Sequence, residues 1–509
     1  MPRAKEEYMS NQKEMEIKLV LDKRSKAKLL KLPLVAKNIV EGSGKTLKLV
    51  SSYYDTKDYK LSGAGMAYRL RKTGKNYEAT VKTAGESLGG FSARGEYTVQ
   101  LQKKELVLQG FAPNFDKKLA TLLADDELHS LFEVVVERKI LLLRITPQTL
   151  LELAMDEGEL RAEGATQLIS EVELEIIEGS KEELFAFVAQ LSQEIPFYVE
   201  NRSKFKRGLD LLAGDGEKLD ELPSLPIIEG ERNAEKEYKK ILFYYLNAVL
   251  VKQNSLKTRE GQRTADEILL PWWERLEALW QLAEPLIPKE EFASQVSALK
   301  DRGEILRALA LVHSCSKDWS QLEELSPELT QNGVLSQALK VKEDALVKQL
   351  GQQIKKGQFT ELAFQLLAYL TTTSWQQAAY LQLDQFAVYR FKKWRSELRE
   401  INKEILLQDR ESLRQARLVA LGFILVGKVI EREKLNKAVR KRLEEFYAKL
   451  TILLVDTVGQ GRLGALCKGS TNKALCADVG LLQGYRLALQ NKVWKKILKI
   501  KNELLLKRS

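Results

Sequence analysis

The sequence has very few of the residues on which disulfide frameworks, zinc sites and histidine-based catalysis depend. Its 509 residues include only three cysteines and two histidines. Because Cys315, Cys467 and Cys476 are odd in number and far apart, we expect neither a disulfide framework nor a cysteine metal cluster, and assign them no role. His129 and His313 make a histidine-ligated zinc site or a Ser-His-Asp triad a poor candidate. A metal site would therefore use carboxylates, which favours hard ions such as Mg²⁺ or Mn²⁺.

Long apolar runs are also missing. No run reaches the roughly 18 to 20 apolar residues that a membrane helix needs, and the polar start MPRAKEEYMSNQKE lacks the apolar core of a signal peptide. We therefore expect a cytoplasmic protein. Its net charge of +11 favours an anionic partner, such as nucleic acid, a phosphate compound or an anionic membrane surface. An ordinary basic cytoplasmic protein would carry the same charge.

Up to about residue 210 the sequence alternates with the period of a β-strand. Segments such as TLKLVSSYYD, MAYRLRKTG and SEVELEII alternate or carry β-branched residues, and turn signals such as SGAG at 62–65 separate them. Strands joined by short turns pair antiparallel. With helices expected near 20–40 and at 180–194, this half predicts an α+β fold dominated by one antiparallel sheet or barrel.

The rest of the chain has a different period. A stretch of Gly, Pro and acidic residues at 213–235 predicts a linker. Beyond it, segments such as YKKILFYYLNAVLVKQ and KRLEEFYAKLTILLVDTV carry apolar residues at i, i+3, i+4 and i+7. No strand pattern interrupts them, so we predict an all-α, bundle-like domain over 236–509.

Several strands of the first half carry charged residues two positions apart. Glu14 and Glu16 form one pair, Arg69 and Arg71 another, and SEVELEII holds three acids. Residues two apart lie on one face of a strand. A sheet with one solvated face shows such alternation, but like charges side by side destabilise it unless opposite charges face them. The second interpretation is an inward-facing set, in which acids hold divalent cations and basic residues hold a polyanion.

The order of these motifs resembles the CYTH domain of triphosphate tunnel metalloenzymes. EMEIK at 14–18 resembles the Glu-x-Glu-x-Lys motif that opens the domain, and MAYRLRKTG, ATVKTAGESLGGFSARGEYTV, VVVERKILL, LLELAMDEGEL, SEVELEII and NRSKFKRG resemble its later motifs in order. The resemblance covers about 8–212 and implies an antiparallel eight-stranded β-tunnel with charged residues in its lumen. Family members hydrolyse inorganic triphosphate or thiamine triphosphate, and a few cyclise ATP or act on RNA 5′-triphosphates.

The same resemblance implies which residues form the site. The implied metal ligands are Glu14, Glu16, Glu171 and Glu173. A shift of two residues on the late strand would replace Glu171 by Glu175. The implied substrate-binding residues are Lys18, Arg69, Arg71, Lys82, Arg94, Arg138 and Lys204. The implied catalytic residues are Glu14, Glu16, Lys18, Glu96 and Asp156, of which Glu96 and Asp156 would support the metal or orient lumen cations.

A second resemblance concerns the helical half. DRESLRQARLVAL resembles a weakened form of the basic helix of CHAD domains, which are all-helical modules often fused behind CYTH. Its Arg410, Arg414 and Arg417 would lie on one helix face. This resemblance implies a polyphosphate contact on the helical domain, whereas a solvated face is the default reading of its basic helices.

The two resemblances together imply metal-dependent hydrolysis of inorganic triphosphate to diphosphate and phosphate in a charged β-tunnel, with Mg²⁺ or Mn²⁺ as cofactor. No P-loop is expected, because GAGM and GESLGG lack its Lys-Ser/Thr pair. The alternatives are a thiamine triphosphatase or adenylate cyclase of the same fold, or a non-catalytic polyphosphate-binding protein. We expect no membrane partner, and the sequence predicts no oligomeric state.

Overall fold

The computed structural model describes residues 12–506 except 125, 215–221, 223–224, 227, 229–231, 331–332, 376–380, 402–408, 430–436 and 469. The chain divides into two compact units, Met1–Pro223 and Ser224–Ser509, and each is described here by itself. Part of the predicted linker at 213–235 lies outside the described residues, so the predicted domain limits stay predictions.

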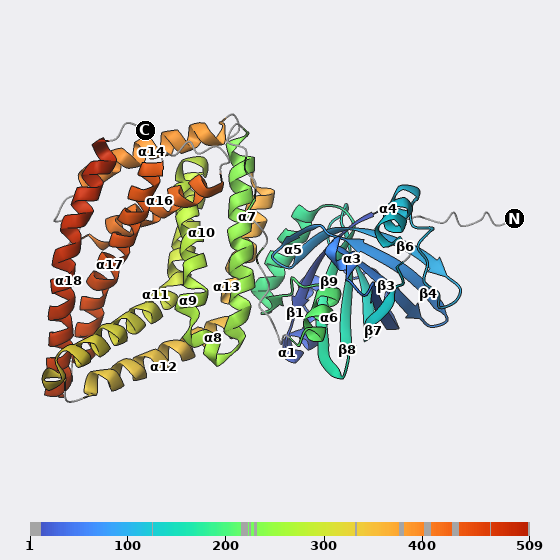
Figure 1. The fold of residues 1–509 in the computed structure, drawn as a ribbon, viewed down its shortest axis with the longest axis horizontal. Coiled ribbons are helices and arrows are strands. Elements are labelled where there is room, and N and C mark those ends of the chain that lie inside the picture. The colour runs from blue at the N-terminus through green and yellow to red at the C-terminus, as the bar shows by residue number, and fades with distance from the viewer. Residues whose placement is uncertain are drawn as a thin grey trace. The chain divides into compact units, whose positions relative to one another are not determined.

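The amino-terminal unit is built on a closed antiparallel β-barrel (Figure 1). Its strands follow the order β1-β9-β8-β7-β2-β3-β4-β6, and β6 pairs with β1 to close the ring. The barrel strands are β1 (Gln12–Val20), β2 (Lys45–Asp55), β3 (Met66–Thr73), β4 (Asn76–Thr83), β6 (Phe91–Leu101), β7 (His129–Arg144), β8 (Leu150–Ala162) and β9 (Ala165–Glu178). Two short strands, β5 (Glu86–Leu88) and β10 (Tyr198–Val199), pair with β6 and β1. The predicted antiparallel eight-stranded fold is confirmed.

Helices cover part of the outer face of the barrel, and the side chains beneath α4 are apolar. The helices of this unit are α1 (Lys23–Leu29), α2 (Pro33–Ala36), α3 (Lys60–Gly63), α4 (Pro113–Leu123), α5 (Lys181–Glu194) and α6 (Lys204–Leu212). On β3, Tyr68 and Leu70 are buried in one cluster with Phe115 and Leu119 of α4. Successive residues of a strand point to opposite faces. Arg69 and Arg71, which alternate with Tyr68 and Leu70, therefore face the barrel interior.

The barrel interior is apolar at one end. Nine buried side chains form a cluster there, namely Leu49, Tyr53, Phe132, Val134, Val136, Leu160, Ala162, Ile169 and Phe205. Tyr53 and Phe132 stack at 4.9 Å between ring centroids, and Phe205 of α6 lies 5.7 Å from Tyr53. Helix α6 approaches this cluster closely at Gly208, where an added Cβ would lie 2.2 Å from the Phe132 ring. The apolar cluster and α6 therefore fill this end of the barrel.

The described elements of the carboxy-terminal unit are all helices, which confirms the predicted all-α region. They are α7 (Ala234–Lys252), η1 (Gln253–Lys257), α8 (Arg259–Arg263), α9 (Ala265–Ile268), α10 (Leu270–Leu282), η2 (Glu284–Leu286), α11 (Lys289–Leu325), η3 (Pro327–Leu329), α12 (Val334–Lys355), α13 (Gln358–Thr372), α14 (Leu383–Glu400), α16 (Arg410–Val429), α17 (Lys437–Cys467) and α18 (Lys473–Leu506). Their core includes the fully buried Trp273, Trp280, Trp319, Trp375 and Trp394. Among the described helices, none has the length and apolar character to cross a membrane.

Candidate active site

The barrel contains a cavity of about 220 Å³ with mostly charged walls. The predicted site residues that line it are Glu14, Glu16, Lys18, Arg69, Arg71, Lys82, Arg94, Glu96, Arg138, Glu173 and Lys204. The structure adds Tyr53, Ala67, Glu78, Thr98, Glu152, Glu175, Ser203 and Phe205. The other two predicted residues, Asp156 and Glu171, are 0% and 1% exposed and do not belong to the cavity wall. The charged strand pairs thus face the lumen and not solvent.

The pairing of β1 with its two neighbours brings distant parts of the sequence together. On one side β1 pairs with β9, so that Glu16 lies opposite Glu175. On the other side β1 pairs with β6, so that Glu14 lies opposite Arg94. Because directly paired residues share a face of the sheet, acids and bases from the start and the end of this unit meet in one lumen.

Lys82 connects the first strand to the hairpin of β4 and β6. Its Nζ lies 2.6 Å from both carboxylate oxygens of Glu14 and 3.6 Å from the carboxylate of Glu96. Burial alone would lower the pKa of Lys82, but the carboxylates of Glu14 and Glu96 outweigh this effect and raise it. Lys82 therefore stays charged inside the barrel.

Arg69 and Arg71 differ in how well their charges are balanced. Arg69 Nη2 lies 3.3 Å from the carboxylate of Glu78 and 3.6 Å from that of Glu96. Arg71 donates from Nε to Ser51 Oγ at 3.1 Å, and its Nη1 lies 3.5 Å from Glu78. Burial alone would lower the pKa of each of these arginines. For Arg69, the charges of Glu78 and other nearby groups outweigh burial and raise the pKa. Burial and the adjacent charge of Arg69 lower the pKa of Arg71 to about 10.

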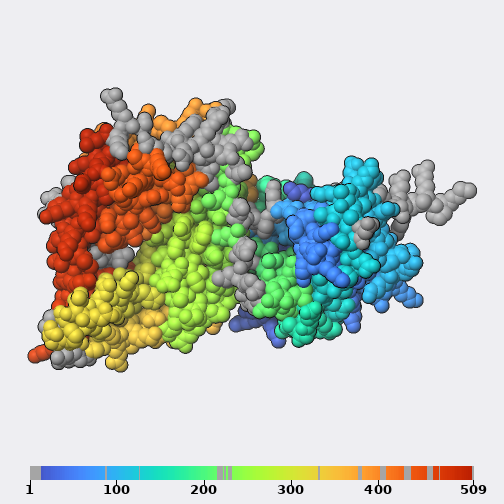
Figure 2. Space-filling view, viewed as in Figure 1, coloured from blue at the N-terminus to red at the C-terminus, as the bar shows by residue number. Residues whose placement is uncertain are grey.

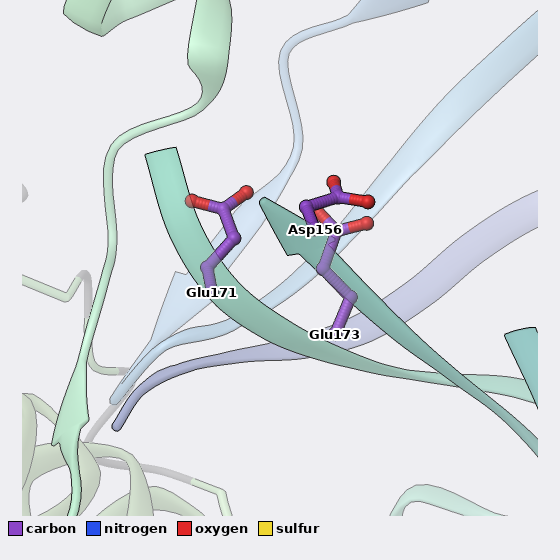
Figure 3. Close-up of side chains that lie close together, drawn as sticks. All are labelled: Asp156, Glu171 and Glu173. Atoms are coloured by element: carbon purple, nitrogen blue, oxygen red, sulfur yellow. The ribbon is translucent and has the colours of Figure 1, made fainter. Parts of the chain in front are cut away.

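Asp156, Glu171 and Glu173 form a buried carboxylate cluster, whose oxygens lie within 4.8 Å of one another (Figure 3). Arg138 donates two hydrogen bonds of 2.7 Å to Asp156 and one of 2.5 Å to Glu173. Lys204 Nζ lies 2.9 Å from the carboxylate of Asp156 and 3.0 Å from that of Glu173, and it also binds Glu171. Burial alone would raise the pKa of Glu173, but Lys204 and Arg138 hold it well below its ordinary value.

Helix α6 supplies a further cation to this cluster. Arg207 is 6% exposed and donates from Nη1 to Glu171 at 2.6 Å. Lys204 comes from the same helix, whose amino terminus is capped by the Ser203 hydroxyl as it accepts a hydrogen bond from Lys206 N. The three acids of the cluster are thus matched by the three cations Arg138, Lys204 and Arg207.

Glu175 lies in a different electrostatic environment. It lines the cavity opposite Glu16 on β1 and opposite Glu152 on β8. Burial, together with the carboxylates of Glu14 and Glu16, raises the pKa of Glu175 to about 8. Four carboxyl groups therefore meet in this part of the wall, where Lys82 binds Glu14 and Lys18 binds Glu16.

The two acidic groups differ in their capacity to bind a metal ion. The cluster of Asp156, Glu171 and Glu173 is already hydrogen-bonded to three cations. The group around Glu175 has excess negative charge, and its ligand atoms are carboxylate oxygens, which suit a hard divalent cation. The residues of this second group therefore fit the predicted cofactor.

Sequence reasoning missed Glu78 and Glu152 and gave Glu175 only as an alternative. Glu78 follows a Tyr on β4 and Glu152 precedes a Leu on β8, so alternation alone would have indicated that each charge shares a face with a predicted site residue. Their contacts depend on strand pairing: Glu78 lies opposite Arg71, and Glu152 opposite Glu175.

The fold and the charged lumen define the class of protein as a closed antiparallel β-barrel whose cavity is lined by both acidic and basic side chains. A family model described as the CYTH domain matches residues 12–209. This match agrees with the resemblance that the sequence motifs indicated for the same part of the chain.

An inorganic triphosphatase from Haemophilus influenzae is 33% identical to the chain over 166 residues. The match covers 32% of this chain and 45% of that protein, so the chain spans less than half the length of this relative. A putative adenylyl cyclase from Hippeastrum, described as having a dominant triphosphatase activity, has 17% identity and a TM-score of 0.28 over 40% of this chain and 96% of its own. The CHAD domain from Ricinus communis has 15% identity and a TM-score of 0.35 over 58% of this chain and 98% of its own.

Proposed function

We propose that the amino-terminal unit hydrolyses inorganic triphosphate to diphosphate and phosphate in a metal-dependent reaction inside the barrel. The observation that carries this proposal is the charge arrangement of the cavity. Seven basic and seven acidic side chains line it, and four of the acids, Glu14, Glu16, Glu152 and Glu175, meet in one part of the wall with excess negative charge. A polyanion and a divalent cation together would satisfy both parts. The name of the Haemophilus influenzae relative supports the same substrate.

Basic residues would bind and align the substrate. Phosphoryl transfer depends on charge neutralisation and alignment more than on covalent catalysis. The proposed substrate-binding residues are Lys18, Arg69, Arg71, Lys82, Arg94, Arg138 and Lys204, all of which line the cavity. Arginine suits this role because its planar fork binds two phosphate oxygens at once. Arg71 would gain most from a bound phosphate, since burial and the charge of Arg69 disfavour its own charge in the free protein.

Acidic residues of the wall would hold the metal ion. We assign this role to Glu14, Glu16 and Glu175, and Glu175 takes the place of the predicted Glu171 and Glu173, whose carboxylates are bound by Lys204 together with Arg207 and Arg138, respectively. When bound, Mg²⁺ or Mn²⁺ would neutralise phosphate oxygens and lower the pKa of the attacking water. Glu96 would orient Lys82 and Arg69, and Asp156 would orient Arg138 and Lys204 through the contacts described above.

The closed end of the barrel favours the proposal that the substrate is small. Tyr53 and Phe205 line the cavity and belong to the apolar cluster that fills the barrel beside α6. A long polyphosphate could not thread through such an interior and would enter with one end only. Inorganic triphosphate has three phosphate groups and no organic group to accommodate.

Thiamine triphosphatase and adenylate cyclase stay the runner-up activities. Their substrates carry a ring that needs an apolar or stacking surface, and Tyr53 and Phe205 are the aromatic residues of the cavity wall. Both rings are buried, at 6% and 9% exposure, and pack against each other and Phe132. A non-catalytic polyphosphate binder would need the basic residues but not the acidic group around Glu175.

Phosphate release from tripolyphosphate, ATP, thiamine triphosphate and long-chain polyphosphate tests these readings, with and without Mg²⁺ and Mn²⁺. We expect metal-dependent turnover of tripolyphosphate above the others, and its loss in Glu16→Gln. Glu137→Gln is the matched control, because Glu137 is exposed on the outside of β7. Absence of turnover for every substrate, with binding retained, would favour the polyphosphate binder.

A separate proposal concerns polyphosphate on the helical unit. A pocket of about 400 Å³ is lined there by the cations Lys300, Arg307, Arg410, Arg414, Arg417 and Arg462 and by the acids Glu274, Glu304 and Glu411. The predicted arginines Arg410, Arg414 and Arg417 thus share one pocket. Binding of labelled polyphosphate to the full chain should weaken in Arg410→Gln/Arg414→Gln and not in Lys392→Gln, whose side chain is exposed on α14. Equal affinity of both variants would refute this contact.

A further inference from the structure

The turn between α17 and α18 brings two thiols together. These two helices lie side by side along one edge of the helical unit (Figures 1 and 2). Helix α17 ends at Cys467, and Cys476 lies in the first turn of α18. Their side chains are in hydrogen-bond contact with each other. Backbone hydrogen bonds hold the residues next to each thiol, from Ser470 N to Cys467 O at 3.0 Å and from Cys476 N to Asn472 O at 3.3 Å.

The third thiol of the chain lies in a different environment. Cys315 is 2% exposed, and Arg486 donates from Nη1 to its Sγ at 3.0 Å. Cys467 and Cys476 are both partly exposed. A small oxidant in solution can therefore reach the paired thiols but not Cys315, which makes Cys315 an internal control.

We propose that Cys467 and Cys476 are a redox-modification site at which a reversible intramolecular disulfide forms. The oxidant is a low-molecular-weight disulfide, such as oxidised glutathione. One protein thiolate attacks a sulfur of this disulfide, which gives a mixed disulfide and releases one glutathione. The second thiolate attacks the protein sulfur of the mixed disulfide and releases the second glutathione. Two electrons pass to the glutathione sulfurs, and the two protons lost by the protein thiols protonate them.

The rate of this exchange should depend on pH. Burial and the hydrogen bond with Cys476 raise the pKa of Cys467 to about 11, and the thiolate is the reactive form. Its thiolate is scarce at neutral pH, so we expect ring closure to accelerate as the pH rises. Reduced glutathione or dithiothreitol should reverse it by the same exchange.

The new bond would join the ends of two long antiparallel helices. It closes a short loop, and crosslinks of this kind stabilise a protein chiefly by restricting the unfolded chain. We expect the oxidised full chain to unfold at a temperature higher by about 5 °C than the reduced chain. Cys476→Ser should show no such rise after the same treatment.

The test uses the full chain, treated with oxidised glutathione at pH 8 and then alkylated under denaturing conditions for peptide mass spectrometry. We expect one alkylated thiol, Cys315, and a linked peptide pair containing Cys467 and Cys476, with three alkylated thiols restored by dithiothreitol. Cys315→Ser should form the same linked pair. The experiment does not depend on any enzymatic activity.

Three results would overturn the proposal. The first is the survival of three free thiols after oxidation. The second is glutathione retained on Cys467 or Cys476 without ring closure, which would mean that the two sulfurs cannot approach each other. The third is a crosslink between two chains or one that includes Cys315.

Discussion

At the scale of single residues, two glutamates of β9 show how surroundings decide chemical character. Glu173 and Glu175 lie two positions apart and both line the cavity. Burial would raise both pKa values, but Lys204 and Arg138 hold that of Glu173 low, whereas Glu14 and Glu16 help to raise that of Glu175 to about 8. In the free protein Glu175 is therefore largely protonated at neutral pH. A divalent cation there would compete with this proton.

The first prediction concerns the pH dependence of stability without metal. The folded pKa of Glu175, about 8, lies above the unfolded value of about 4.3. The folded protein therefore holds a proton that the unfolded chain loses, and stability falls as pH rises from about 4 to about 8 and then levels off. Urea unfolding in a chelator should show Glu175→Gln to be more stable at pH 8 than the parent chain by roughly 4 to 5 kcal/mol, and equal at pH 4.

Mg²⁺ supplies the control for this prediction. It should stabilise the parent chain more at pH 8 than at pH 5, because the ion needs the ionised carboxylate, and it should stabilise Glu175→Gln less. If the parent and variant lose stability in parallel between pH 4 and pH 8, the acidic group does not carry the proposed excess charge.

The second prediction contrasts the two arginines of β3. Arg71→Met should raise KM for tripolyphosphate by about tenfold or more, since a charged hydrogen bond to phosphate is lost. It should not lower the stability of the free protein, because burial and Arg69 already disfavour the charge of Arg71. Arg69→Met should lower that stability, because it removes the one cation that lies beside both Glu78 and Glu96 and leaves each acid with a single cationic neighbour. Steady-state kinetics and urea unfolding of both variants measure this contrast, and equal losses of stability would contradict it.

At the scale of elements, the barrel strands could be predicted because alternation and turn residues are local signals. The charged lumen could not be predicted from alternation alone. Glu14 and Glu16 could face solvent or interior until strand pairing placed them beside Arg94 and Glu175. The ordered series of motifs, which is not local, indicated the inward-facing arrangement correctly.

Three helices of the same unit lay outside the prediction, namely the short α3, α4 and α6. In α4, Phe115, Leu119 and Leu123 are spaced by four residues behind a Pro, a local helix signal that we did not use. In α6 the buried residues include Lys204 and Arg207. Buried cations do not contribute to the apolar pattern by which a helix is identified in a sequence. Their burial depends on the acids that they meet in the barrel. The same dependence left the choice between Glu171 and Glu175 open.

The third prediction concerns α6. Arg207→Met should lower the unfolding free energy by about 3 kcal/mol, because it removes one partner of the fully buried Glu171. Lys206→Met is the matched control on the same helix, since the Lys206 side chain is 56% exposed and its partner Asp210 keeps a second cation, Arg202, at 3.7 Å; its effect should stay within about 1 kcal/mol. Urea unfolding at pH 7 compares the two. A loss in Lys206→Met as large as that in Arg207→Met would mean that α6 is sensitive to any lost charge.

At the scale of the whole molecule, the chain has two compact units with different ways of forming a core. The barrel places its apolar side chains outside, under helices, and at one closed end, which leaves a charged interior. The helical unit buries its apolar side chains, including five tryptophans, between helices. Charge repulsion inside the free barrel opposes its folding, whereas no such group of acids lines the described core of the helical unit. Ligands that neutralise the barrel interior should therefore act on one unit selectively.

The last prediction follows from this difference. A ligand that binds only the folded state at 100 times its Kd stabilises that state by about 2.7 kcal/mol. Hydrogen exchange of the full chain with saturating Mg²⁺ and a non-hydrolysable triphosphate analogue should therefore slow the amides of β1, β6, β8 and β9. The amides of α10 and α13, which form part of the helical core, should exchange at unchanged rates. Glu16→Gln should abolish the slowing in the strands. Slowing confined to the helices would place the main triphosphate site in the basic pocket of the helical unit, and would contradict the assignment of the lumen.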